Sequence, residues 1–200
     1  MKNRWMIWLV VLGALGRAEN IDPYNTDSQY GWAENAGWLN AEPGVGGGMQ
    51  VDANQVSGWV WGENIGWINL HCINTNNCRN VRFGVANDGA GSLSGFAWGE
   101  NVGWINFSPT YGGVTIDSQG RMTGWAWGEN IGWIRFDGTQ IWSVRVCIVT
   151  LDDLANFASD WLAVGSLPGN LDLTNAVDMA DFALFAQKWL TYCPDGWLLK

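Results

Sequence analysis

Apolar and polar residues alternate over the first two thirds of the chain in short runs that recur at a fixed spacing. The stretch S-G-W-V-W-G-E-N-I-G-W-I-N-L occupies residues 57–70, close copies follow at 94–107 and 123–136, and a degenerate copy lies near 30–40. Alternation with period two predicts strands, and the central Gly-Glu-Asn predicts a hairpin turn. The copies repeat every 29 residues, with one insertion of eight residues between the second and third. We therefore expect a tandem array of small β-units.

Each unit is predicted to contain three short antiparallel strands, because a further apolar segment precedes each aromatic hairpin, as at Val51-Asp52 and Ile116-Asp117. If Gly62-Glu63-Asn64 forms a three-residue loop, Trp61 pairs with Ile65 and Trp59 pairs with Trp67. One face of the hairpin then carries Trp59, Trp61, Ile65 and Trp67, and the other carries Gly58, Val60, Gly66 and Ile68. A two-residue Glu-Asn loop would shift the pairing by one residue and move Trp67 to the other face.

The two ends of the repeat array are complementary. The first copy lacks an obvious leading strand, whereas Trp142-Ser143-Val144-Arg145-Val146 reads as a leading strand with no repeat after it. We expect this last strand to complete the first unit, which would protect the sheet edges. A ring, a sandwich and an open sheet all remain compatible with the pattern.

Beyond residue 147 the apolar period changes to that of a helix. Residues 150–162 align with residues 178–190, and both segments place aromatic residues on one helical face. Thr150 with Asp153, and Asp178 with Asp181, have the spacing of helix-capping pairs. The predicted fold is mainly β with a small α C-terminal domain: a β-repeat domain over 19–146 and a pair of helices, packed through their aromatic faces, over 147–200.

The first eighteen residues have the composition of a secretory signal peptide. Lys2 and Arg4 precede an apolar run from Trp5 to Leu15, and small residues follow up to Ala18. The run is too short to span a bilayer, so we expect a secreted bacterial protein, extracellular or at the cell surface, that is not membrane-spanning. Removal of residues 1–18 leaves seven basic against 19 acidic residues, a formal charge of −12. This charge disfavours nucleic acid and anionic lipid as partners.

The cysteines are even in number, and an oxidising destination makes disulfides the expected state. Local spacing predicts a bond from Cys72 to Cys78 within the eight-residue insertion, and a bond from Cys147 to Cys193 that brackets the C-terminal segment. His71 with Cys72 and Cys78 could instead offer zinc ligands, although a structural zinc site normally takes four.

Residues 170–181, N-L-D-L-T-N-A-V-D-M-A-D, fit a twelve-residue loop for a cation. Calcium takes six to eight oxygen ligands, and alternating loop positions point inward. We expect one calcium ion, with the Ala176 carbonyl and five side chains as ligands: Asn170, Asp172, Thr174, Asp178 and Asp181. In this arrangement Asn175 takes the sharp turn, and Val177 anchors the loop in the core.

This loop, the helix D-F-A-L-F-A-Q-K-W-L and the duplication resemble the type I dockerin domain over residues 141–193. The resemblance implies a tandem of two calcium-loop-and-helix motifs, calcium-dependent folding and, as partner, a cohesin-like or cell-surface protein. The first loop departs from the family pattern, because Trp142, Val144 and Val146 stand at its ligand positions. A helical hairpin whose aspartates only cap helices is the alternative. The W-G-E-N-I-G-W repeats are similar to Trp/Gly-rich repeats of other secreted bacterial proteins, a likeness that implies no particular activity.

The repeated indoles have two interpretations. Either each Trp is packed in the core of a Gly-rich array, or some copies present indoles to sugar rings. The candidate carbohydrate-binding residues are Trp59, Trp67, Trp104, Trp133, Glu63, Glu100 and Glu129, with Asn64, Asn101 and Asn130 as further hydroxyl contacts.

Catalysis is not expected, because every repeated Glu occupies a copy of the same turn and a glycosidase needs two carboxylates in different environments. The sequence therefore predicts a secreted, non-enzymatic modular protein, in which a β-repeat scaffold carries a calcium-stabilised dockerin-like module for attachment or assembly. The alternative is a carbohydrate-binding protein associated with extracellular polysaccharide degradation.

Overall fold

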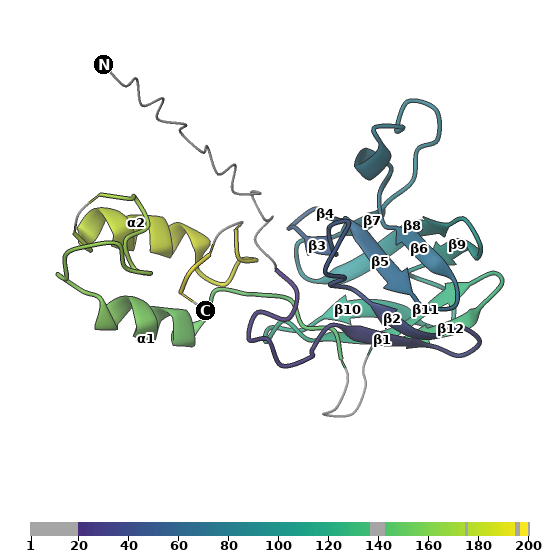
Figure 1. Ribbon diagram of the computed structural model, residues 1–200, viewed down its shortest axis with the longest axis horizontal. Coiled ribbons are helices and arrows are strands. Elements are labelled where there is room, and N and C mark those ends of the chain that lie inside the picture. The colour runs from purple at the N-terminus through teal and green to yellow at the C-terminus, as the bar shows by residue number, and fades with distance from the viewer. Residues whose placement is uncertain (1–19, 137–142, 175, 195–196, 200) are drawn as a thin grey trace, which may run out of the picture.

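The computed structural model describes residues 20–136, 143–174, 176–194 and 197–199. Within them, a β-barrel lies beside a pair of short helices, and a loop with a 3-10 helix (Cys72–Thr75) projects from the barrel (Figure 1). The predicted fold class, mainly β with a small helical C-terminal part, is confirmed. The predicted leader at 1–18 lies outside the described residues.

Four aromatic hairpins build the barrel in the described part of the chain. Their strands are β1 (Tyr30–Ala33), β2 (Gly37–Asn40), β5 (Trp59–Gly62), β6 (Gly66–Asn69), β8 (Ser92–Gly99), β9 (Gly103–Asn106), β11 (Met122–Gly128) and β12 (Gly132–Arg135). Each strand pairs antiparallel with the next in this order, and β12 returns to pair with β1. Every repeat therefore contributes one hairpin to a closed eight-stranded barrel.

The leading segments of the repeats form a second tier at one end of the barrel. They are β3 (Gln50–Val51), β4 (Gln55–Ser57), β7 (Val85–Asn87) and β10 (Gly113–Ile116), which pair with one another and with the first halves of β8 and β11. The tier continues through single bridges that join Arg121 to Arg145, Gln29 to Val144 and Ile21 to Val146. The segment Ser143–Val146 thus completes the first unit, as expected, whereas Trp142 lies outside the described residues.

An asparagine side chain closes this second tier. Asn20 is only 1% exposed, its Nδ2 donates to the Val51 carbonyl at 2.7 Å, and its Oδ1 accepts from the Val51 N–H at 3.1 Å. A carboxamide carries the same donor and acceptor as a peptide group. Asn20 therefore pairs with β3 in place of a further strand residue.

The hairpin register differs from the predicted one. Trp61 pairs with Trp67 and Gly62 pairs with Gly66, so the three-residue loop is Glu63-Asn64-Ile65. The reason lies in the turn, since Gly66 rather than Asn64 adopts a positive φ, of 76°, and glycine does so without a steric penalty. Trp59, Trp61 and Trp67 do share a face, but the prediction for Ile65 was wrong, because this side chain packs against the barrel core.

The barrel interior is mainly aliphatic, although the barrel core also contains Phe107 and Phe136. Its inward side chains are Ala33, Leu39, Val60, Ile68, Ala97, Ile105, Ala126 and Ile134, all buried. Eight strands leave an interior only wide enough for side chains of this size. The indoles consequently lie on the outer surface, where Trp32, Trp98 and Trp127 are 38–39% exposed. The interpretation of each repeated Trp as core was therefore wrong.

Asparagines of the turns link the hairpins into a ring. The Nδ2 atoms of Asn64, Asn101, Asn130 and Asn35 donate, at 3.0–3.3 Å, to the carbonyls of Ala36, Ile65, Val102 and Ile131 respectively. Each acceptor belongs to the turn of the preceding hairpin, and Asn35 connects the first repeat to the last. These amides thus bind backbone groups between repeats, and the repetition of this asparagine has a structural cause.

The C-terminal part contains α1 (Leu151–Ser159) and α2 (Met179–Lys188). Phe157 and Phe185 are buried between them with ring centroids 5.4 Å apart, so the aromatic faces pack as predicted. The capping pairs also form. Asp153 accepts from the Thr150 N–H at 2.8 Å, and Asp181 accepts from the Asp178 N–H at 2.9 Å.

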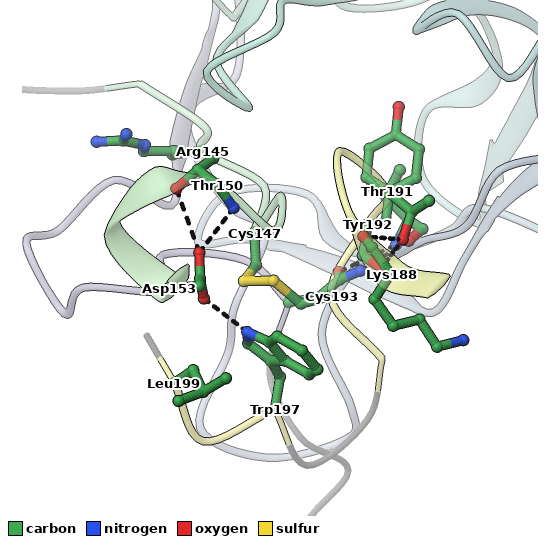
Figure 2. Close-up of a disulfide and its surroundings, with 12 residues drawn as sticks. Arg145, Cys147, Thr150, Asp153, Lys188, Thr191, Tyr192, Cys193, Trp197 and Leu199 are labelled. Carbon is green, nitrogen blue, oxygen red and sulfur yellow. Dashed lines mark hydrogen bonds between the residues drawn. A yellow bond between two sulfur atoms is a disulfide. The ribbon is translucent and has the colours of Figure 1, made fainter. Parts of the chain in front are cut away.

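A disulfide joins the entry and exit of this helical part. Figure 2 shows the bond between Cys147 and Cys193 beside the Asp153 carboxylate, which also accepts from Trp197 Nε1 at 2.6 Å. Both predicted disulfides, this one and Cys72–Cys78, are confirmed. The hydrophobic clusters of the barrel and of the helices meet around the Cys147–Cys193 bond: Ile148 and Tyr192 pack against the barrel cluster, whereas Cys147, Val149 and Cys193 belong to the helical cluster.

Candidate functional site

Clusters of aromatic rings cover the outer surface of the barrel. In the second repeat the Trp67 ring lies 4.9 Å from Trp61 and 6.3 Å from Trp59, in edge-to-face contact. The other repeats reproduce this triplet around Trp38, Trp104 and Trp133. Edge-to-face contacts fix the orientation of each indole, so the barrel presents rigid apolar surfaces to solvent.

A groove lies where the triplets of the second and third repeats meet, along the seam between β6 and β8. Its volume is about 690 Å³, and its lining residues are Trp59, Trp67, Asn69, Thr75, Asn77, Val81, Phe83, Trp98, Glu100 and Trp104. We name it the loop-side groove, because Thr75, Asn77, Val81 and Phe83 belong to the inserted loop. Indoles from both repeats line it together with the polar side chains of Asn69, Thr75, Asn77 and Glu100.

The inserted loop is held firmly against the barrel. Asn74 donates from Nδ2 to the Gly58 carbonyl at 2.6 Å and accepts at Oδ1 from the Gly58 N–H at 3.0 Å. Asn69 Oδ1 accepts from the His71 N–H at 3.1 Å and from Asn74 Nδ2 at 2.6 Å. These contacts fix the Asn69 amide, which lines the groove. The Phe83 ring lies 5.5 Å from Trp104 and joins the loop to the third triplet.

The histidine of the loop has a structural environment. His71 Nδ1 accepts from the Ile73 N–H at 3.2 Å, and burial lowers the pKa of the imidazole, which favours its neutral form. His71, Cys72 and Cys78 do lie together, with their potential ligand atoms within 4.8 Å of one another. Both sulfurs are joined in a disulfide, so they do not offer the thiolates that zinc takes.

The loop-side groove contains part of the predicted carbohydrate-binding set. Trp59, Trp67, Trp104 and Glu100 line it, whereas Glu63 and Glu129 do not, and Trp133 lies in the fourth repeat. Glu129 instead directs Oε2 to the Trp104 N–H at 3.5 Å. Sequence reasoning missed Trp98 and the loop residues. The equivalence of Trp98 to Trp61 along the repeat was visible, but the contact between repeats depends on the closed barrel.

The aspartates of the predicted cation loop make backbone hydrogen bonds. Asp172 Oδ1 accepts from the Thr174 N–H and Asp178 Oδ1 accepts from the Ala180 N–H, and among the described residues these carboxylates form no cluster of potential metal ligands. Asp181 accepts at Oδ1 from the Asp172 N–H and at Oδ2 from the Asp178 N–H, both at 2.9 Å. Burial alone raises the pKa of the Asp181 carboxyl, but the backbone donors outweigh it, so this pKa lies below its ordinary value. Val177 is fully buried, as expected for the anchor.

The Asn170 side chain at the start of this loop is buried. Asn170 is 6% exposed, and its Oδ1 has no hydrogen-bond partner among the described residues. Its Nδ2 donates to the carbonyls of Gly165 and Thr174, which orients the amide. Asn175 lies outside the described residues. Upstream of α1, Val144 and Val146 are buried in the barrel core, so the first dockerin-like motif has no cation loop at these positions.

Comparison of the chain with models of known protein families, with curated proteins and with solved structures found no match. The likeness to dockerins and to Trp/Gly-rich repeats therefore stays an interpretation of the residues themselves. Among the described residues, no helix combines the length and apolar character needed to cross a membrane.

Proposed function

We propose that this protein is a non-enzymatic polysaccharide-binding protein, whose barrel holds sugar rings in the loop-side groove and whose helical part serves for attachment. The observation that carries the proposal is the outward placement of the indoles. Trp98 is 38% exposed, and the same arrangement of indoles recurs around the barrel. Exposed apolar clusters with a polar rim are typical of binding surfaces.

The chemistry of the groove suits a carbohydrate. The apolar face of a pyranose ring packs on an indole, and the ring hydroxyls need donors and acceptors around it. Thr75, Asn77 and Glu100 line the groove and can supply these groups, together with the Asn69 amide. A volume of about 690 Å³ lies within the usual range of ligand sites, roughly 300–1,000 Å³.

The carboxylates favour binding over hydrolysis. Among the residues that line the loop-side groove, Glu100 is the sole acid. Glycosidases require two carboxylates across the scissile bond. The net charge of −12 without the leader also favours a neutral polymer, since a polyanion would be repelled.

The test is depletion of the protein from solution by insoluble cellulose, xylan, mannan and chitin. Trp98→Ala should weaken binding to the retained polymer at least tenfold. Trp127→Ala is the matched control. Trp127 is as exposed as Trp98 and contacts Trp133 as Trp98 contacts Trp104. It does not line the loop-side groove. Binding to none of the polymers, or equal loss in both variants, would contradict the proposal.

Attachment through the dockerin-like part, with one calcium ion, belongs to the same proposal. The buried Asn170 Oδ1 without a partner supports a cation there, and Asp172, Thr174, Asp178, Asp181 and the Ala176 carbonyl would supply the further oxygens. Calorimetric titration should show one calcium bound, with binding lost in Asp172→Ala and kept in Asp152→Ala, which removes an exposed charge from α1. An absence of heat at millimolar calcium would remove the cation from the proposal.

A further inference from the structure

A second groove crosses the seam where the barrel closes. It lies between β12 and β1, has a volume of about 600 Å³, and is lined by Trp32, Glu34, Trp38, Trp125, Trp133 and Arg135. We name it the closure groove. Two of its indoles come from the first repeat and two from the fourth. The loop-side groove likewise takes two indoles from the second repeat and two from the third.

The two grooves match residue by residue. Trp32, Glu34 and Trp38 stand 66 positions before Trp98, Glu100 and Trp104, and Trp125, Trp133 and Arg135 stand 66 positions after Trp59, Trp67 and Asn69. Every residue of the closure groove thus has a counterpart at the same offset. The offset spans two repeats, so half a turn of the barrel relates the grooves.

Two glycines, Gly46 and Gly112, are also separated by 66 positions. A Cβ on Gly46 would lie 2.9 Å from the Trp67 ring, and a Cβ on Gly112 would lie 2.9 Å from the Trp133 ring. The backbone at both glycines therefore lies close against the middle indole of a triplet. The relation of the grooves consequently extends to the loops that support their indoles.

The strand order places the grooves on opposite sides of the barrel. Four strands separate the β6–β8 seam from the β12–β1 seam in either direction around the closed sheet of described residues. A saccharide chain in one groove leaves the other accessible. Two indole-lined sites that face away from each other suit the bridging of separate chains, in which the second contact raises overall retention through its effective concentration.

We infer that the closure groove is a second saccharide site and that one barrel binds two polysaccharide chains at once. This inference rests on the proposed function of the loop-side groove. The chemistry is the same in both sites: indole walls and a glutamate. Arg135 stands at the repeat position of Asn69, and its guanidinium lies 5.3 Å from the centroid of the Trp125 ring.

The experiment is calorimetric titration with a hexasaccharide of whichever polymer is retained, namely cellohexaose, xylohexaose, mannohexaose or chitohexaose. The expected stoichiometry is two for the unaltered protein and one for each of Trp98→Ala and Trp32→Ala. The double variant should bind none. Trp61→Ala and Trp127→Ala form the control pair, because they also stand 66 positions apart and line neither groove; both should keep two sites.

Melting curves of the four single variants separate loss of a site from loss of the fold, since all four remove one indole from a triplet. A stoichiometry of one that Trp98→Ala abolishes and Trp32→Ala leaves unchanged would overturn the second site while leaving the first intact. Absence of binding to every polymer would remove both.

Discussion

The Asn20 side chain provides a sharp test of how the barrel tier is closed. Asn20→Ala would leave the buried N–H and carbonyl of Val51 without partners. Each unsatisfied buried group costs about 1–3 kcal/mol, so the free energy of unfolding should fall by about 2–6 kcal/mol. Urea unfolding followed by tryptophan fluorescence measures this change.

The isosteric variant Asn20→Asp separates the donor from the acceptor. The introduced carboxylate can still accept from the Val51 N–H, but it faces the Val51 carbonyl without a proton. At pH 7 we expect destabilisation of about 2–4 kcal/mol from the lost hydrogen bond and the buried charge. Protonation restores a donor, so the difference from the unaltered protein should shrink as the pH falls below about 5, where a carboxyl of raised pKa gains its proton.

Asn54→Asp is the control, because Asn54 lies in an exposed turn and its replacement should leave stability nearly unchanged. Equal stabilities of Asn20→Asp and Asn54→Asp at pH 7 would refute the closure by Asn20. So would a destabilisation in Asn20→Asp that stays constant with pH.

Three further predictions concern cross-links, acid stability and the asparagine ring. The residues of the Cys147–Cys193 bond are 46 positions apart and those of the Cys72–Cys78 bond are 6 apart, so the chain-entropy relation gives stabilisations of about 4 and about 2 kcal/mol. Urea unfolding of the two paired Cys→Ser variants should therefore show the larger loss for Cys147–Cys193, and a larger loss for Cys72–Cys78 would contradict the relation. The depressed pKa of Asp181 adds stability that is present above about pH 4, the range of an unfolded carboxyl, and is lost as the pH falls through the lower folded value. Asp181→Asn should therefore reduce the fall in the free energy of unfolding at acid pH, and an unchanged fall would argue against this role. Asn64→Ala should lower stability by about 1 kcal/mol through its lost bond to the Ala36 carbonyl, whereas Glu63→Ala in the same turn should change it less.

Local features of the chain could be predicted from sequence because each depends on neighbouring residues. The alternation in W-V-W placed Trp59 and Trp61 on one face, and the spacing of Asp178 and Asp181 indicated the helix cap that the structure contains. The hairpin register was not predicted, because it depends on which residue takes the left-handed conformation. Asn64 and Gly66 both can, and the turn uses Gly66.

Features that depend on closure could not be derived in the same way. Whether an indole faces inward depends on the width of the interior, which is set by the number of strands that close. The candidate site has the same origin. Trp67 and Glu100 were both selected from the repeat, but their meeting in one groove with Asn77 and Phe83 requires the adjacency of β6 and β8 and the position of the inserted loop.

Closure of the barrel also affects when the protein can fold. β1 pairs with β2 on one edge, but its other edge pairs with β12, and Ile21 pairs with Val146. One edge of the earliest strand therefore lacks its final partner until nearly all of the barrel sequence has been synthesised. Contacts between residues so distant in sequence slow folding, because a long stretch of polymer must first be brought together. For a chain with a leader such as that predicted at residues 1–18, we expect the barrel to close only after its last strand has crossed the membrane.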